Sequence, residues 1–480
     1  MTFQEKSDYN KIRICNLVPN GTGGELKMID RMLMDALRVA RKILQSHKTL
    51  TLVSSADGQV WAGKVYYGEK DGYIYVALEQ GRNYRNIIAN PRVFFVIEHG
   101  VPDRFIQGEG IAERLGPIEE RPERHIIFQN APELVVFAKS FPGVEVFRIR
   151  PTRLYVSEFT GVWKPRAEIE VTDEVMQIFK TQMSTQVPAW KVYWKAVRPF
   201  SFTVTVMSVL LGALMAPQFS WTWFLLTFLG ALLMHAGVNV ISDAFDYRRG
   251  VDNWRTLGSS RVLVDGLMTA SAHLWWGLLL FGLGCGIGLI LAYFRGWPVL
   301  IFGLAGAILG FFYTAPPLGL KYRALGDLAV FLAFGPLMAM GTYYVQTQEI
   351  SWQLAWLAVP FGLLTIAILH GNNFRDIEED SRAGYKTIAG LLGPRGSSLY
   401  YLLLVVGAYA FTILFVALGW LPIWSLLILL TVPYAWRNIR IAFQPTRVAF
   451  TLLDLLTAQL HMLFGLALLG SILLSRWVQL

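Results

Sequence analysis

Apolar residues are distributed unevenly along the chain, and their pattern predicts two regions of different kinds. Up to about residue 185, charged residues interrupt short alternating stretches, which is typical of soluble β-structure. From about Arg198 onward, long apolar stretches follow one another with short polar breaks, and we interpret nine of them as membrane spans of roughly 17–25 residues. The expected spans are 199–216, 221–241, 273–293, 297–314, 326–346, 352–370, 397–418, 421–436 and 450–474.

The basic residues between these spans predict their orientation. Cytoplasmic connections of membrane proteins are enriched in Lys and Arg. If the first span begins in the cytoplasm, the connections on that side carry 16 basic residues, and the opposite side carries two, Arg295 and Arg476. We therefore expect an integral protein of the cytoplasmic (inner) membrane, with the N-terminal region in the cytoplasm and the C-terminus on the opposite side.

The N-terminal region has the pattern of a small antiparallel barrel. A helix-like stretch at about 30–47 precedes strand-like stretches that are separated by Gly and Asp turns. The strand-like stretches are 50–55, 60–70, 73–78, 92–98, 104–115 and 144–159.

The whole chain is therefore expected to be multidomain, with an N-terminal β-barrel and an all-α polytopic membrane domain of about nine helices. Aromatic and Lys residues alternate in "VPAWKVYWKAVRP" (187–199), a composition that favours the membrane interface. The expected parts are a polar extension at 1–28, the barrel at 29–160, a linker with an interfacial collar at 161–197, and the membrane domain at 198–480.

Composition narrows the chemistry that the chain can perform. The 480 residues are 54% hydrophobic and 16% charged, which is too apolar for an ordinary soluble protein. The two cysteines, Cys15 and Cys285, leave no basis for a disulfide framework or a cysteine metal site. The net charge of +9 comes mostly from the cytoplasmic connections, so it does not indicate a nucleic-acid partner.

Two acidic motifs follow apolar stretches on the same side of the membrane. They are "NVISDAFDYRRGVDN" (239–253), after the second span, and "HGNNFRDIEEDSRAGYKT" (370–387), after the sixth. Residues three or four apart share a helix face, so each motif places Asn and Asp side chains on one stripe. Two facing carboxylate clusters repel each other unless cations lie between them, and Mg²⁺ suits carboxylates and bridges proteins to phosphate oxygens.

We therefore predict a site for a lipid diphosphate at these helix ends, with the apolar bundle holding a hydrocarbon tail. The candidate metal ligands are Asn239, Ser242, Asp243, Asp246, Asp252, Asn372, Asp376 and Asp380. Four of them are also candidate catalytic residues: Asp243, Asp246, Asp376 and Asp380. The candidate diphosphate-binding residues are Arg248, Arg249, Lys321, Arg323 and Lys386.

Two other readings of these motifs remain to be weighed. The acidic residues could be solvated helix ends, but two such clusters on the same side of the membrane argue against this interpretation. A transporter is the second alternative, but transporters carry ionisable groups or broken helices near mid-span, whereas these aspartates lie at the span ends.

The pair of motifs resembles the aspartate-rich motifs of the UbiA superfamily of intramembrane aromatic prenyltransferases. The resemblance covers about residues 195–475 and includes "RP" at Arg198–Pro199 and "YTAPPLGLKYRALGD" (313–327). Within the superfamily, "FGPLMAMGTYYVQT" (334–347) and "NNFRDIEEDSRAGYKTIAGLLG" (372–393) are most similar to 1,4-dihydroxy-2-naphthoate polyprenyltransferases. One position departs from the pattern, because Ser242 stands where members commonly have Asn.

This resemblance implies Mg²⁺-dependent transfer of a polyprenyl group from polyprenyl diphosphate to dihydroxynaphthoate, with loss of carbon dioxide, in menaquinone biosynthesis. It also implies substrate-binding roles for Arg198 and Tyr313. Other acceptors stay open at this point: 4-hydroxybenzoate, homogentisate or a lipid alcohol.

The barrel sequence resembles the split-barrel flavin-binding domains related to pyridoxamine 5′-phosphate oxidase. The stretches that carry it are "TLVSSADGQVWAGKVYY", "GRNYRNIIANPRVFFVI" and "IQGEGIAERL". The resemblance implies FMN bound at a homodimer interface, with a redox or sensing role, and Asn83 stands where the family often has a phosphate-binding Lys. The candidate cofactor-binding residues are Lys64, Arg82, Asn83 and Arg85. The alternative is that the barrel serves only as an assembly module.

Overall fold

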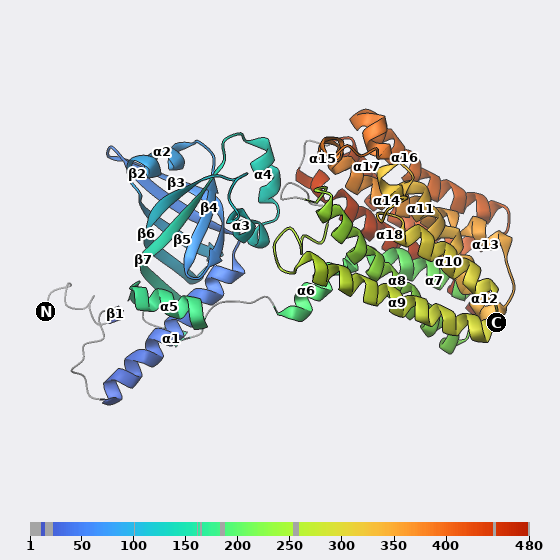
Figure 1. Ribbon diagram of the computed structural model, residues 1–480, viewed down its shortest axis with the longest axis horizontal. Coiled ribbons are helices and arrows are strands. Elements are labelled where there is room, and N and C mark those ends of the chain that lie inside the picture. The colour runs from blue at the N-terminus through green and yellow to red at the C-terminus, as the bar shows by residue number, and fades with distance from the viewer. Residues whose placement is uncertain are drawn as a thin grey trace. The chain divides into compact units, whose positions relative to one another are not determined.

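The computed structural model describes residues 11–14, 23–99, 101–160, 162–163, 166–182, 188–252, 259–444 and 448–478. The chain divides into two units, Met1–Val187 and Pro188–Leu480. The first consists mainly of strands and the second of helices (Figure 1).

The first unit is built on a closed antiparallel barrel of six strands. Their order is β7-β4-β3-β2-β5-β6, and β6 pairs with β7 to close the barrel. The strands are β2 (Thr49–Ala56), β3 (Gln59–Lys70), β4 (Tyr73–Leu78), β5 (Arg92–His99), β6 (Val101–Pro117) and β7 (Glu145–Thr160). Three short strands extend the sheet beyond β7: β9 (Arg166–Glu170), β1 (Lys11–Ile14), which runs parallel to β9, and β8 (Val162–Trp163). The antiparallel barrel expected from the sequence is confirmed.

Alternation and turn chemistry explain the barrel locally. Every second residue of β2 up to Ser54 is buried, including Leu50 and Leu52. The hairpins β2–β3 and β3–β4 turn at Asp57–Gly58 and Asp71–Gly72, where both residues have positive φ, the conformation that two-residue hairpins require.

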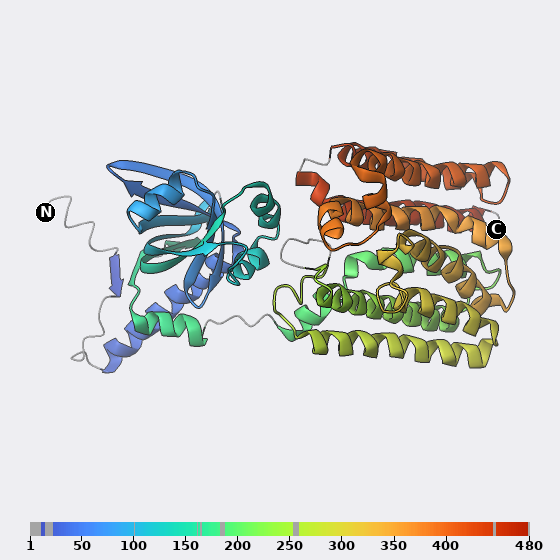
Figure 2. The same ribbon diagram turned by 45° about the horizontal axis from the view of Figure 1, so that its top comes forward.

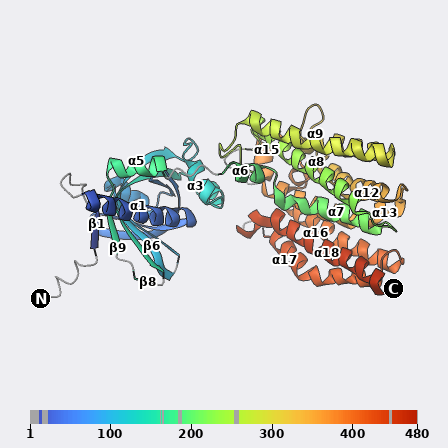
Figure 3. The ribbon, with the colours of Figure 1, turned by 90° about the horizontal axis from the view of Figure 1, so that it is seen from below.

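Short helices connect or cover the barrel strands. Helix α1 (Gly23–Ser46) packs Leu37 and Ile43 into the barrel core, and α5 (Asp173–Gln182) lies near it (Figure 3). The remaining helices of this unit are α2 (Arg82–Ala89), α3 (Arg124–Asn130) and α4 (Leu134–Ser140).

The second unit is a bundle of helices that run largely alongside one another (Figure 2). Its α-helices are α6 (Ala189–Ala196), α7 (Thr203–Met215), α8 (Trp221–Arg248), α9 (Ala270–Arg295), α10 (Pro298–Phe311), α11 (Gly326–Leu332), α12 (Met338–Thr347), α13 (Trp352–Leu357), α14 (Val359–Arg375), α15 (Ile377–Arg382), α16 (Ile388–Ala417), α17 (Val432–Ala442) and α18 (Leu453–Val478). Tighter or wider helical turns occur at η2 (Pro199–Phe202), η3 (Leu320–Tyr322), η4 (Ala333–Leu337), η5 (Ile423–Thr431) and η6 (Val448–Leu452).

Among the described residues, six helices are long and apolar enough to cross a membrane, or seven if the bent pair of α6 with η2–α7 is one span. The nine spans expected from the sequence are therefore not shown. Helix α10 has only 14 residues, and the apolar stretch at 421–436 divides into the 3₁₀ turns of η5 and the start of α17, which has a Pro in its first turn. The six are Trp221–Arg248, Ala270–Arg295, Gly326–Thr347, Trp352–Arg375, Ile388–Ala417 and Phe450–Arg476.

Close helix packing fixes the end of α8 within the bundle. A Cβ on Gly237 of α8 would lie 2.6 Å from the backbone nitrogen of Phe281 in α9, and one on Gly212 of α7 would lie 2.3 Å from the carbonyl oxygen of Ala339 in α12. Only glycine permits backbones to approach this closely, which is a common device between membrane helices. The part of α8 that leads into the first acidic motif is thereby held closely against α9.

Candidate active site

The two acidic motifs line one small cavity of about 20 Å³, which we call the acid pocket. Asp243 and Asp246 come from α8, Asp252 from the turn after it, Asp376 from the junction of α14 and α15, and Asp380 from α15. All five are buried. The other lining residues are Arg198, Val251, Ser259, Lys321, Asn372 and Asn373.

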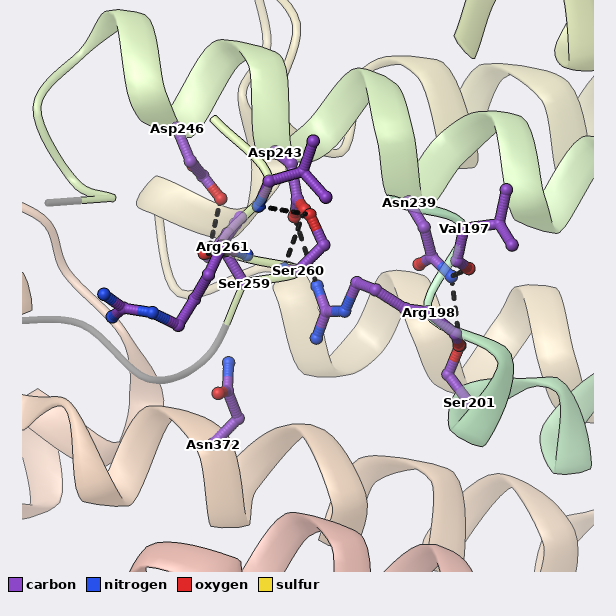
Figure 4. A network of polar contacts seen from close by, with 12 residues as sticks. Val197, Arg198, Ser201, Asn239, Asp243, Asp246, Ser259, Ser260, Arg261 and Asn372 are labelled. Atoms are coloured by element: carbon purple, nitrogen blue, oxygen red, sulfur yellow. Dashed lines mark hydrogen bonds and ion pairs between the residues drawn. The ribbon is translucent and has the colours of Figure 1, made fainter. Parts of the chain in front are cut away.

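Basic and hydroxyl groups hold the first motif in place. Asp246 accepts hydrogen bonds from Lys321 Nζ at 2.7 Å and from Tyr322 Oη at 2.5 Å. Asp243 Oδ2 accepts from the backbone nitrogen of Ser260 at 2.9 Å, and its Oδ1 lies 3.5 Å from Arg198 Nη1 (Figure 4). Each carboxylate is thus oriented by donors from another part of the chain.

The second motif is held by Arg375, the last residue of α14. Its Nη2 lies 3.1 Å from Asp376 Oδ2 and also donates to Asn372 Oδ1. Burial raises the pKa of Asp380 to about 7; the nearby Lys321 acts in the opposite direction, and the Asp376 carboxylate raises the pKa further. Burial, followed by Asp246 and Asp243, also raises the pKa of Asp252 well above its usual range. A bound cation would relieve this cost of placing several carboxylates together.

The side chains of the acid pocket fit a divalent cation whose ligands come partly from the protein and partly from the substrate. Among the described residues, no group of three or more His, Cys, Asp and Glu side chains is arranged to hold a metal ion alone. Mg²⁺ characteristically takes one or two carboxylates and completes its shell with water and substrate phosphates. The acid pocket provides these carboxylates, because its described lining holds five aspartates and two basic residues, Arg198 and Lys321.

A larger cavity of about 280 Å³ adjoins the acid pocket, and we call it the apolar cavity. The two cavities share Arg198, Lys321 and Asn372 among their lining residues. Most of the remaining lining is apolar or glycine, including Val238, Leu291, Val299, Phe302, Gly303, Gly306, Leu309, Phe334, Leu337 and Met338. The arrangement suits a ligand with an anionic head and a long hydrocarbon tail.

Three residues expected near the metal or substrate line the apolar cavity and not the acid pocket. They are Asn239, Ser242 and Tyr313. Asn239 Nδ2 donates to the carbonyl oxygen of Val197 and to Ser201 Oγ, both at 3.0 Å (Figure 4). Its amide therefore ties α8 to the entry of α7.

Of the five basic residues expected to bind diphosphate, Lys321 lines both cavities. Arg248, Arg249, Arg323 and Lys386 are exposed and are not among the described residues that line either cavity. The Arg249 guanidinium lies 4.4 Å from the ring centre of Tyr322, and Arg323 donates to the carbonyl oxygen of Pro317 at 3.2 Å.

Sequence reasoning missed Tyr322, Ser259, the backbone nitrogen of Ser260, Asn373 and Arg375. Three of them, Tyr322, Asn373 and Arg375, lie inside the sequence motifs described above. Each directly neighbours a predicted site residue, and this adjacency is a signal that could have identified them. The contribution of Ser260 comes from a main-chain nitrogen, which no side-chain pattern reveals.

In the barrel, the four candidate cofactor residues divide into one buried and three exposed side chains. Asn83 is buried, and its Oδ1 accepts a hydrogen bond from Ser54 Oγ at 2.8 Å. Lys64, Arg82 and Arg85 are exposed, and the Arg82 guanidinium lies 4.5 Å from the ring centre of Trp61. Asn83 therefore packs within the barrel, whereas the three basic side chains lie at its surface.

Comparison with known proteins decides the family of the second unit. The model of the UbiA prenyltransferase family matches residues 205–474, more than half of the chain. The chain belongs to this family. As a family member it is a prenyltransferase, and the acid pocket and the apolar cavity both lie within the matched residues, apart from Arg198 to Val204 at its edge.

Two relatives and one solved structure are similar to parts of the chain. A UbiA prenyltransferase domain-containing protein 1 homolog of Drosophila melanogaster is 33% identical over 287 residues, covering 58% of this chain and 77% of the relative. A 1,4-dihydroxy-2-naphthoate octaprenyltransferase of Bacillus subtilis is 27% identical over 290 residues, covering 59% and 93%. The barrel is similar to a putative pyridoxamine 5′-phosphate oxidase of Listeria innocua, with 19% identity, a TM-score of 0.21, and coverage of 26% of this chain and 97% of the other.

Proposed function

We propose that the second unit transfers a polyprenyl group from polyprenyl diphosphate to 1,4-dihydroxy-2-naphthoate in a Mg²⁺-dependent step of menaquinone biosynthesis. The observation that carries this proposal is the direct adjacency of an acid pocket and an apolar cavity that share Arg198, Lys321 and Asn372. The Bacillus subtilis relative, named for that acceptor, supports the choice of substrate.

Each group around the acid pocket has a role in holding the diphosphate. The five aspartates of the pocket, Asp243, Asp246, Asp252, Asp376 and Asp380, would hold Mg²⁺, which would neutralise the charge of the leaving diphosphate. Lys321 and Arg198 add positive charge at the boundary between the cavities, where the reacting carbon of the prenyl group would lie. Asn372 and Asn373 add amide groups to the same wall.

The reaction itself exchanges one bond for another. The C–O bond between the prenyl carbon and the diphosphate breaks, and its electron pair leaves with the diphosphate. The ring carbon that bears the carboxylate then supplies the electrons of the new C–C bond. The bond from that carbon to the carboxylate breaks, its electron pair returns to the ring, and carbon dioxide leaves. The apolar cavity keeps water from the allylic cation, which water would otherwise quench.

We propose that the acid pocket faces the cytoplasm of a bacterial-type inner membrane. Basic residues are concentrated in the connections at that end of the bundle. Asp454, in the first turn of α18, contacts Arg375 beside the pocket, so α18 leads from the pocket end to a C-terminus on the opposite side. The N-terminal unit would then lie in the cytoplasm.

We expect the full-length protein in liposomes to prenylate 1,4-dihydroxy-2-naphthoate faster than 4-hydroxybenzoate, homogentisate or a lipid alcohol. The expected product has lost one carbon dioxide, which mass spectrometry detects directly. If another acceptor in an equimolar mixture gives the dominant product, the acceptor assignment is wrong while the prenyltransferase assignment stands.

For the first unit, we propose weak to moderate FMN binding by a homodimeric split barrel. The support is the exposed basic group formed by Lys64, Arg82 and Arg85 near the start of α2. Asn83 adds no phosphate contact of its own, because its side chain is buried and bound to Ser54. A missing charged hydrogen bond weakens binding by roughly 1.5–3 kcal/mol.

We expect FMN fluorescence to be quenched on titration with the full-length protein, and Arg82→Ala to weaken the binding. The matched control is Lys70→Ala, which removes an exposed charge from the far end of β3. An unchanged FMN signal with a monomeric mass would leave the barrel as an assembly module.

A further inference from the structure

The Arg375 side chain uses all of its hydrogen-bond donors. An Arg guanidinium carries five N–H groups. Nε and Nη2 donate to Oδ1 and Oδ2 of Asp376, at 3.3 and 3.1 Å, and Nη2 also donates to Asn372 Oδ1. Nη1 donates to the carbonyl oxygen of Thr451 and to Asp454 Oδ2, at 3.0 and 3.1 Å.

These bonds connect the acid pocket to the start of the last helix. Asn372 and Asp376 line the pocket, whereas Thr451 and Asp454 belong to η6 and α18. The Arg375 side chain is 6% exposed and the Asp454 side chain 12% exposed, so water competes little for these contacts. Asp454 Oδ1 also accepts from the backbone nitrogen of Leu455 at 2.8 Å, which fixes the orientation of its carboxylate.

We propose that Arg375, anchored by Asp454, is a positioning residue that sets how tightly the acid pocket binds a divalent cation. This inference rests on the proposed Mg²⁺-dependent function. Arg375 grips both oxygens of Asp376 in a fork, so it determines which lone pairs of that carboxylate remain for the cation. Asp454 lines the apolar cavity but is not among the described residues that line the acid pocket, and its carboxylate is connected to that pocket through Arg375.

The geometry distinguishes this role from simple anchoring of α18. Anchoring needs only the bonds from Nη1 to Thr451 and Asp454, whereas Nε and Nη2 are directed entirely at pocket residues. A Lys at this position keeps the charge but cannot form the fork. Residues that orient metal ligands typically contribute 10- to 100-fold to metal affinity, which gives the expected scale.

The test measures Mn²⁺ binding to the full-length, detergent-solubilised protein in the presence of geranylgeranyl thiolodiphosphate. Electron paramagnetic resonance monitors the binding. We expect Arg375→Lys to raise the Mn²⁺ dissociation constant about tenfold. Asp454→Ala should raise it less, and Asp454→Asn, which keeps an acceptor for Nη1, should stay close to the unchanged protein. In turnover assays, excess Mg²⁺ should restore much of kcat in Arg375→Lys.

The matched control is Arg295→Lys, because Arg295 also donates to main-chain carbonyl oxygens, those of Val345 and Gln346, but ends α9 at the opposite end of the bundle. It should lower the melting temperature without changing Mn²⁺ binding. If Arg375→Lys does not fold, Asp454→Ala, which leaves Arg375 in place, decides the question.

The outcomes separate the two proposals. Unchanged Mn²⁺ affinity in folded Arg375→Lys and Asp454→Ala, with normal binding by the unchanged protein, overturns the positioning role alone. An unchanged protein that does not bind Mn²⁺ together with the thiolodiphosphate overturns the proposed function as well.

Discussion

Asp380→Asn should lower prenyl transfer by about 10²–10³-fold, the usual scale for removing one electrostatic contact to a transition state. Asp380 is buried and lines the acid pocket. The substitution keeps the shape of the side chain and removes its negative charge. It should therefore weaken cation and diphosphate binding while the helical bundle still folds.

Glu379→Gln is the matched control for this substitution. Glu379 is the preceding residue, is equally buried and lies in the same helix, but its carboxylate lies 3.5 Å from Arg382 Nη1 and is not among the pocket-lining residues. Initial rates at saturating Mg²⁺ should stay close to those of the unchanged protein. Equal losses in both variants would mean that the loss follows from damage to α15 and not from the pocket.

Lys321→Gln should raise the KM for polyprenyl diphosphate and lower kcat, together by about 10- to 100-fold in kcat/KM. Lys321 lies between the two cavities, and its Nζ is 2.7 Å from Asp246 Oδ2. The substitution removes positive charge where diphosphate leaves and deprives a buried carboxylate of its ionic partner. The KM for the aromatic acceptor should change much less.

Arg323→Gln, two residues further along the chain, tests whether the effect is specific to Lys321 or follows from the loss of any basic residue in this segment. Arg323 is exposed and donates to the carbonyl oxygen of Pro317. We expect its steady-state constants to remain close to those of the unchanged protein, and we expect the same for Arg248→Gln and Lys386→Gln. A larger loss in Arg323→Gln than in Lys321→Gln would contradict the position assigned to the diphosphate.

The proximity of the two acidic motifs was predictable from the sequence. Both follow apolar stretches on the same side, and spacings of three and four residues place Asp243 with Asp246, and Asn372 with Asp376, on shared helix faces. The antiparallel barrel followed in the same way from alternation and from Asp-Gly turns. These features depend on local periodicity, which the chain carries without reference to its tertiary structure.

The sequence named both basic residues that line the cavities, Arg198 and Lys321, but it could not separate them from the exposed basic residues. Arg248 follows Asp246 by two residues, and residues two apart on a helix do not share a face. Asn239 shares a face with Asp243 but lies one turn earlier, where its amide bonds the carbonyl oxygen of Val197 at the end of α6. Carbonyl groups at the end of a helix have no partner within that helix. The bond from Asn239 therefore depends on how α6 and α8 pack together, which the sequence pattern does not reveal.

The number of spans shows a further limit of apolar patterns. The stretch at 421–436 is as apolar as a membrane helix, yet it forms the 3₁₀ turns of η5 followed by α17. Apolar composition does not distinguish a helix that crosses the bilayer from shorter helical pieces packed within the bundle. The lengths of the membrane-spanning helices are known only from the backbone structure.

We propose that the acid pocket holds polyprenyl diphosphate through a divalent cation for transfer to an aromatic acceptor. The most direct measurement is the formation of prenylated product by the full-length protein in liposomes, with polyprenyl diphosphate and 1,4-dihydroxy-2-naphthoate, in Mg²⁺ and in excess chelator. We expect product in Mg²⁺, no product in chelator, and recovery of product formation when Mg²⁺ is restored in excess. Equal product formation with and without chelator would contradict it.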